Sequence, residues 1–276
     1  MYQFQSLEEI SMQALAQCFN GAFSDYEQPI CFTPESLRYY LTASAVDLSL
    51  SYGAFREGEL VAFILNAKGA YQGENVVFDA GTGVIPQHRG KKVFSALFAY
   101  TCQQLRRRGI TRYILEALQS NHHAVSIYRK KGFSVQREYS VLTASGAAEG
   151  WEAPVDVMPY GEFERFPTKI SPEPSFEHTT YNIGQNPQLY EVRYVPGQAY
   201  CIYAKRNGEI IQLHYNAPEA LKQVMAAVIR RYPSAMAKNI DCGCTDVLQI
   251  LQQLGFREIT RQYEMGKDLS AEEKAF

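Results

Sequence analysis

A group of polar residues in the first half of the chain lies at junctions between predicted strands and helices. Residues 76–139 alternate between β-rich and helical patterns in the order strand, turn, helix, strand, helix, strand. Arg89 and Gly90 fall at the first strand-to-helix turn, and Asn121 heads the second helix. A turn of this kind offers unpaired backbone N–H groups and the positive end of a helix dipole, which suit a phosphate. The pattern therefore predicts a site for a phosphate-bearing ligand.

Two common phosphate-binding motifs do not fit this turn. The P-loop pattern would need a glycine and a hydroxyl where the chain has Ile85 and Lys92. The dinucleotide pattern starts with Gly81 and Gly83, but Pro86 takes the place of its last glycine. The sequence therefore disfavours a nucleotide hydrolase.

Length and composition restrict the protein classes that fit. The chain has 276 residues and 46% apolar content, so we expect two domains rather than one. A formal net charge of −2 gives no general attraction to nucleic acid or to a membrane surface. No apolar run approaches the roughly 18 residues that indicate a membrane span. The start MYQFQSLEEI carries no export signature, and six irregularly spaced cysteines indicate a reducing compartment, so we expect a soluble cytoplasmic protein.

The first half is predicted to be a mixed α/β arrangement. Ser6 and Glu9 have the spacing of a capping box that starts a first helix, and Thr33 with Pro34 starts a second. Glu57-Gly58 joins two strands as a hairpin. The strand, helix, strand order that follows implies parallel neighbours with helical crossovers. The predicted strands are 49–56, 59–66, 76–85, 113–118 and 133–142, and the later helices are 91–108 and 121–131.

The second half repeats this plan. We place domains at residues 1–144 and 161–276, joined by a linker at 145–160 with glycine, alanine and proline. Three strands, a helix, a strand, a helix and a last strand follow between residues 190 and 265. The fold is therefore predicted to be α/β with two tandem domains, each a mixed β-sheet flanked by helices.

The chemical residues of the first half are not repeated. The Gly-Phe pair that closes the last helix of each half aligns the two copies. In this alignment Leu251 stands at the position of Tyr128, and Cys244 stands at the position of Asn121. Arg89-Gly90 has no counterpart. We therefore expect the second copy to keep the fold without the site.

The string Asn121, Ala124, Tyr128, Gly132 and Phe133, together with the Arg89-Gly90 turn, resembles the GNAT N-acetyltransferase superfamily. The second half resembles the C-terminal unit of tandem GNAT proteins in four stretches. These stretches are 208–213, 239–241, 254–256 and the closing 262–265. The resemblance implies acetyl-CoA as co-substrate.

The resemblance also implies where the coenzyme binds. The strand ending at Val84 would separate from its neighbour and expose backbone groups of Val84 and Ile85 to the pantetheine arm and the thioester oxygen, where they would stabilise a developing oxyanion. Lys92 and Phe94 replace the small residues of the family's phosphate pattern, and we expect them to crowd the coenzyme. Asn121 would bind the pantetheine arm, although a helix N-cap also explains it. The implied coenzyme residues are Val84, Ile85, Arg89, Gly90, Lys91, Lys92, Val93, Phe94 and Asn121.

Proton transfer requires an acid and a base. By resemblance Tyr128 would donate its phenolic proton to the departing thiolate; a buried core tyrosine is the alternative. A lysine-like amine has a pKa of about 10.4 and must lose a proton before it attacks. Asp79 is the first candidate for the base and Glu116 the second, and each could instead be a structural carboxylate.

The acceptor is the least specified part of the site. Asp25, Tyr26 and Glu27 lie on a predicted loop and could shape a cationic acceptor pocket, or form a solvated loop. His122-His123 and Cys242-Gly243-Cys244 lack a second ligand pair at zinc spacing, so no metal is expected.

The sequence therefore predicts an acetyl-CoA-dependent N-acetyltransferase that acts on a small-molecule or peptide amine by direct attack in a ternary complex. Neither nucleic acid nor a membrane is an expected partner, and a homodimer is one expected assembly. The alternative from another class is a non-catalytic acyl-CoA sensor or scaffold. A further alternative is that residues 161–276 serve only for dimerisation or as a substrate lid.

Overall fold

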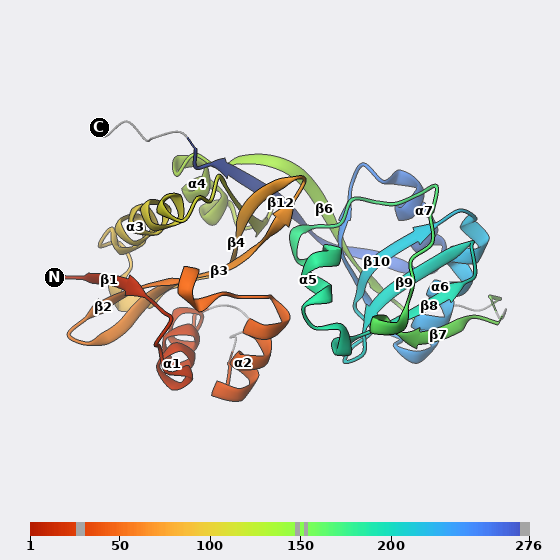
Figure 1. The fold of residues 1–276 in the computed structure, drawn as a ribbon, viewed down its shortest axis with the longest axis horizontal. Helices are drawn as coiled ribbons and strands as arrows, with labels where there is room; N and C mark the ends of the chain where they lie inside the picture. Colours follow the sequence, from red (N-terminus) through yellow and green to blue (C-terminus); the bar gives the residue numbers. More distant parts are fainter. Residues whose placement is uncertain (26–30, 147–149, 152–153, 271–276) are drawn as a thin grey trace. The chain divides into compact units, whose positions relative to one another are not determined.

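The computed structural model describes residues 1–25, 31–146, 150–151 and 154–270, and the chain forms two compact units (Figure 1). Unit 1 comprises Met1–Leu115 together with the segment from Gly266 onward, and unit 2 comprises Glu116–Met265. The predicted domains 1–144 and 161–276, which follow the sequence repeat, stay a prediction.

Unit 1 is built on a sheet with helices on both faces. Strands β1 to β4 are antiparallel neighbours in sequence order, and β5 joins β4 in parallel after a crossover through α3. Helices α1 and α2 lie on one face of this sheet and α3 lies on the other (Figure 1). The elements are β1 (Gln3–Ser6), α1 (Met12–Ala22), α2 (Pro34–Ala43), β2 (Tyr52–Arg56), β3 (Glu59–Tyr71), β4 (Glu74–Val84), α3 (Val93–Arg107) and β5 (Arg112–Leu118).

The helix starts of unit 1 confirm one sequence prediction and correct another. Thr33 caps α2 in a capping box with Ser36, with proline at the first helical position. The capping box predicted at Ser6 is wrong, because Ser6 ends the edge strand β1. Helix α1 starts later, where the Ser11 side chain accepts the Ala14 N–H at 3.1 Å. A serine followed three residues later by glutamate was therefore a misleading local signal.

A close contact fixes α1 against the end of β4. The ring of Phe19 on α1 stacks on Phe63 of β3 with centroids 5.1 Å apart. Gly83 of β4 lies against Phe63 and Ala22, and a Cβ added there would stand 2.6 Å from the Phe63 ring and 2.8 Å from Ala22 Cβ. Only glycine therefore lets the end of β4 approach α1 so closely.

The strands of unit 2 follow the order β12-β6-β11-β10-β9-β8-β7. β8, β9 and β10 form an antiparallel meander, β11 joins β10 in parallel after α6, and β6 pairs antiparallel with β11. Buried side chains of α6 and α7 form one core with β9, β10 and β11. The elements are α4 (His122–Lys130), β6 (Ser134–Ala144), β7 (Asp156–Pro159), α5 (Thr180–Gly184), β8 (Tyr190–Val195), β9 (Ala199–Ala204), β10 (Ile210–Tyr215), α6 (Pro218–Arg231), β11 (Met236–Asp241), α7 (Thr245–Gln253) and β12 (Phe256–Asp268).

Local geometry confirms that the fold is repeated. Helices α4 and α7 each have nine residues. Their N-caps have nearly the same backbone angles, φ −82° and ψ 66° at Asn121 and φ −84° and ψ 64° at Cys244. Both helices are followed by a left-handed glycine, with φ 85° at Gly132 and φ 82° at Gly255. The backbone of the last helix is thus conserved between the halves although its polar residues differ.

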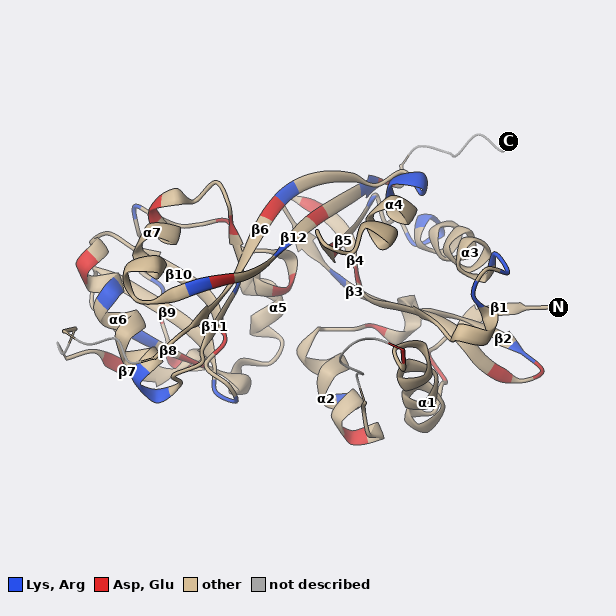
Figure 2. Cartoon of the chain, turned by 180° about the vertical axis from the view of Figure 1, so that it is seen from behind, with Lys and Arg blue, Asp and Glu red and all other residues tan. Residues whose placement is uncertain are grey.

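Positive and negative side chains are interspersed along the elements of each unit (Figure 2). Within the described residues, no helix is both long enough and apolar enough to cross a membrane.

Candidate functional site

Strands β4 and β5 pair over only part of their length. Their parallel ladder runs from Val76 opposite Arg112 to Asp79 opposite Leu115. β4 continues to Val84 and stays paired with β3 up to that residue, on its other edge. The last residues of β4 therefore present one edge to β3, while the ladder to β5 has already ended.

The backbone groups of Val84 and Ile85 point to opposite edges of the strand. The Ile85 N–H donates to the Val61 carbonyl at 3.0 Å, so this donor is used within the sheet. Because adjacent residues of a strand alternate in direction, the N–H and C=O of Val84 point away from β3. Of the two predicted oxyanion donors, Val84 is the one that the sheet directs outward.

Asp79 supports an irregularity in β4. The register between β3 and β4 shifts after the Asn66–Asp79 pair, which leaves Ala80 as the extra residue. One carboxylate oxygen of Asp79 accepts the Gly81 N–H at 3.0 Å and the other accepts the Thr82 hydroxyl at 2.7 Å. Tyr40 of α2 donates to the Ala80 carbonyl. These contacts favour a structural role for Asp79, as a carboxylate that holds the bulge of β4, over the role of catalytic base.

The turn from β4 into α3 has the backbone form of an anion site. Gly90 and Lys92 adopt left-handed conformations with φ 72° and 59°. Lys92 is the N-cap of α3 and makes no side-chain capping hydrogen bond. Left-handed residues that alternate with right-handed ones turn successive N–H groups toward one concave surface. Lys91 and Lys92 are both exposed beside this surface.

Phe94, in the first turn of α3, is half-buried and its ring lies 5.7 Å from that of Phe98. Val93 is buried. The ring of Phe94 therefore packs along its own helix, and the predicted crowding of the coenzyme stays a prediction.

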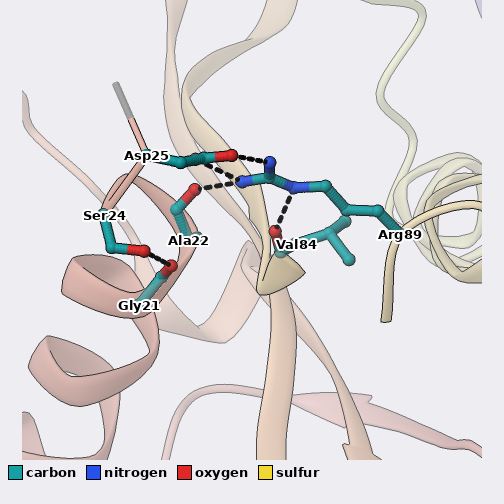
Figure 3. A network of polar contacts seen from close by, with 6 residues as sticks. All are labelled: Gly21, Ala22, Ser24, Asp25, Val84 and Arg89. Atoms are coloured by element: carbon teal, nitrogen blue, oxygen red, sulfur yellow. Dashed lines mark hydrogen bonds and ion pairs between the residues drawn. The ribbon is translucent and has the colours of Figure 1, made fainter. Parts of the chain in front are cut away.

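Arg89 and Asp25, predicted for two different ligands, bind each other (Figure 3). The guanidinium meets the two carboxylate oxygens at 2.5 and 3.0 Å. Two further hydrogen bonds go to the carbonyls of Val84 at 3.0 Å and Ala22 at 2.7 Å. The hydrogen bond from Arg89 holds the pKa of Asp25 below its ordinary value. The other two predicted acceptor residues, Tyr26 and Glu27, lie outside the described residues.

Asn121 and Tyr128 lie on α4 in unit 2. The Asn121 side chain caps the helix by accepting the Ala124 N–H at 3.0 Å. This confirms the capping role and leaves its amide Nδ2 without a hydrogen-bond partner among the described residues. Tyr128 is half-buried, and its ring meets Phe133 edge-on with centroids 5.6 Å apart.

Glu116, the second candidate for the base, has an unusual environment in unit 2. One of its oxygens, Oε2, accepts the Asn239 amide at 2.8 Å, while Oε1 is buried and finds no hydrogen-bond partner among the described residues. Burial, with repulsion from Glu177 and Glu264, raises the pKa of Glu116 to about 8. Asn239 escaped the sequence analysis as a site residue. Its signal was an asparagine inside a predicted strand, where this residue type is depleted.

The second repeat has a filled region where the first repeat has its open strand end. β10 and β11 correspond to β4 and β5, and their parallel ladder is reduced to the pair Ile210–Ala237. Residues 175–178 are bonded to both strands. Gln212 of β10 donates to the His178 carbonyl at 2.5 Å, and Asn239 of β11 donates to Ser175 Oγ at 3.1 Å. Leu251, at the position of Tyr128, is fully buried.

Residues 12–133 match the model of the acetyltransferase (GNAT) family. No curated protein matches the chain.

Among solved structures, a candidate acetyltransferase from Pyrococcus horikoshii has a TM-score of 0.71 at 13% identity, and the match covers 97% of this chain and 89% of the other chain. A tandem GNAT protein from the clavulanic acid biosynthesis pathway has a TM-score of 0.65 at 11% identity, covering 99% and 100%. A GCN5-related N-acetyltransferase from Sphaerobacter thermophilus has a TM-score of 0.62 at 14% identity, covering 97% and 96%. At these identities the structures report on the fold. Residues 12–133 thus belong to the acetyltransferase (GNAT) family, and the chain as a whole has the tandem GNAT fold.

Proposed function

We propose that the chain is an acetyl-CoA-dependent N-acetyltransferase that acts on a primary amine by direct attack in a ternary complex. The observation that carries this proposal is the turn before α3. Left-handed Gly90 and Lys92 lead into the start of α3, where the N-cap residue Lys92 makes no side-chain capping hydrogen bond within the described residues, and this suits a pyrophosphate. The neighbouring Lys91 and Lys92 add positive charge. Acetyl-CoA would supply the acetyl group as an activated thioester.

The residues of the chain supply hydrogen bonds and protons to this transfer. The amine nitrogen forms a bond to the thioester carbon, and the carbon–sulfur bond breaks. The N–H of Val84 stabilises negative charge on the carbonyl oxygen. Tyr128 gives its proton to the sulfur that leaves, and Asn121 offers its free amide N–H groups to the pantetheine arm.

The base takes the proton that the amine releases. Asp79 remains one candidate, but its two oxygens already accept hydrogen bonds within β4. Glu116 has one oxygen without a partner among the described residues and a raised pKa of about 8. A base with a pKa near the working pH is the most effective, so we favour Glu116.

We propose a small-molecule or peptide amine as the acceptor, without nucleic acid or membrane as a partner. A cytoplasmic location and a homodimer are also proposals. All six cysteines lie in the described part of the chain and none of them forms a disulfide, which supports a reducing compartment.

Calorimetry with coenzyme A and thiol release with a panel of primary amines test the function. We expect one coenzyme bound per chain and release of thiol that depends on an amine. Tyr128→Phe should reduce turnover by roughly 10²-fold or more while coenzyme binding is retained. No uptake of coenzyme A would overturn the proposal, and full turnover by Tyr128→Phe would remove the acid role.

The alternative is an acyl-CoA sensor or scaffold. It is favoured by Lys92 and Phe94, which stand where the family has small residues. Coenzyme binding at one site per chain without turnover of any amine in the panel would support this alternative.

A further inference from the structure

We propose that Asn239, in the second repeat, is a positioning residue that holds the Glu116 carboxylate with one oxygen bound and the other available to accept a proton. This inference rests on the proposed function. It gives the second repeat a part in the reaction although its own coenzyme residues are missing.

The geometry is that of a base and the group that orients it. Asn239 Nδ2 donates to Glu116 Oε2 at 2.8 Å. Oε1 of the same carboxylate is buried and has no hydrogen-bond partner among the described residues. A buried acceptor of this kind costs free energy unless it gains a partner. A proton donor that arrives with the substrate would provide that partner.

The Asn239 amide is itself fixed on both sides. Its Oδ1 accepts from Gln262 Nε2 at 2.9 Å, and its Nδ2 also donates to Ser175 Oγ at 3.1 Å. With its two amide hydrogens and its oxygen engaged, the side chain has a single orientation. Three different segments of unit 2 therefore determine where Glu116 points.

The backbone of Asn239 adopts the left-handed conformation, which is unfavourable for a residue with a side chain. Its φ is 55°, and the register of β11 against β6 shifts between Ala237 and Ile240. Asparagine tolerates the left-handed region better than other residues with a side chain, yet the conformation still has a cost there. Backbone strain of this kind concentrates at functional positions.

The charged groups around Glu116 come from the same unit. Glu177 lies in the short helical turn Phe176–His178 and Glu264 on β12, and both disfavour a second negative charge. Lys238 on β11 and the hydrogen bond from Asn239 act in the opposite sense. Lys238 is shared with Glu209, which lies 3.2 Å away. Asn239 is thus the neutral group that favours the ionised form of Glu116.

Asn239→Gly tests the proposal, because glycine accepts a positive φ and removes only the amide. We expect the inflection of kcat/KM against pH to move upward by on the order of one pH unit, and the rate at pH 7 to fall on the order of tenfold. The KM for acetyl-CoA should not change. Asn216→Gly is the matched control, since Asn216 bonds only to backbone groups.

A second measurement does not need an active enzyme. The carbon-13 signal of the Glu116 carboxyl, assigned with Glu116→Gln, should titrate at a higher pH in Asn239→Gly than in the wild type. Asn239→Asp, which keeps the size of the residue, should raise it further. An unchanged titration, or a loss of rate that is equal at every pH, would overturn the proposal. A wild type without transferase activity would overturn the proposed function alone, since the titration still reports on the pair.

Discussion

The carboxylate of Asp25 and the guanidinium of Arg89 form a two-point ion pair although 64 residues separate them in the chain. Arg89 is also bound to the ends of α1 and β4 through Ala22 and Val84. A guanidinium with four such acceptors has little capacity left for a pyrophosphate in the same position. Arg89 therefore fastens the start of the predicted acceptor loop to the coenzyme turn.

Replacement of Arg89 should affect the acceptor more than the coenzyme. In Arg89→Gln we expect faster amide exchange at residues 22–25 and an acceptor KM higher on the order of tenfold, the effect of losing charge-assisted hydrogen bonds. Arg89→Lys should behave similarly, because an ammonium cannot reproduce the planar fork. Arg107→Gln on α3 is the control. A large loss of coenzyme affinity with an unchanged acceptor KM would instead assign Arg89 to the pyrophosphate.

The left-handed Lys92 gives a prediction about stability. A side chain at positive φ costs about 1–2 kcal/mol, whereas glycine costs nothing there but loses about 0.5–1 kcal/mol through unfolded-state entropy. Lys92→Gly should therefore be at least as stable as the wild type in urea unfolding. Lys91→Gly, at a position without positive φ, should be less stable by about 1 kcal/mol. Equal losses in the two variants would contradict the left-handed turn.

Helix capping distinguishes the two repeats. Asn121→Ala should lower the free energy of unfolding by about 1 kcal/mol, since it removes the hydrogen bond to the Ala124 N–H. Cys244→Ala, at the same position of α7, should have little effect because Cys244 makes no side-chain cap. Urea unfolding monitored by circular dichroism measures both. A loss at Cys244 as large as that at Asn121 would contradict this difference.

Local patterns predicted the elements well and the contacts poorly. Glu57-Gly58 and Thr33-Pro34 were read correctly because their chemistry acts over a few residues. The short edge strand β1 was missed. Its four residues show too little alternation of polar and apolar side chains to predict a strand, and Ser6 also fits the pattern of a capping box. Pairs such as Glu116 with Asn239, 123 residues apart, depend on how strands are ordered in the sheet. No local pattern contains that information.

The buried carboxyl of Glu116 makes stability depend on pH. Its pKa is raised to about 8 in the folded chain, against an ordinary value of 4.5, so the folded state holds this proton more tightly than the unfolded state. The free energy of unfolding should therefore fall as pH rises from about 4.5 to 8. Glu116→Gln removes this loss. The free energy of unfolding of the variant, relative to that of the wild type, should therefore rise by a few kcal/mol at most across that range, since each pKa unit is worth about 1.4 kcal/mol.

The measurement compares wild type and Glu116→Gln by urea unfolding at several pH values. Burial lowers the pKa of His178 from its ordinary value of 6.5 to about 4. Its contribution to the free energy of unfolding is therefore lost as pH falls from about 6.5 to 4, a pH dependence opposite in sign to that of Glu116. This contribution is common to both proteins and cancels in the difference. A difference that stays constant between pH 5 and 8.5 would show that Glu116 titrates normally, and it would then be no better suited than Asp79 to take the proton of the amine.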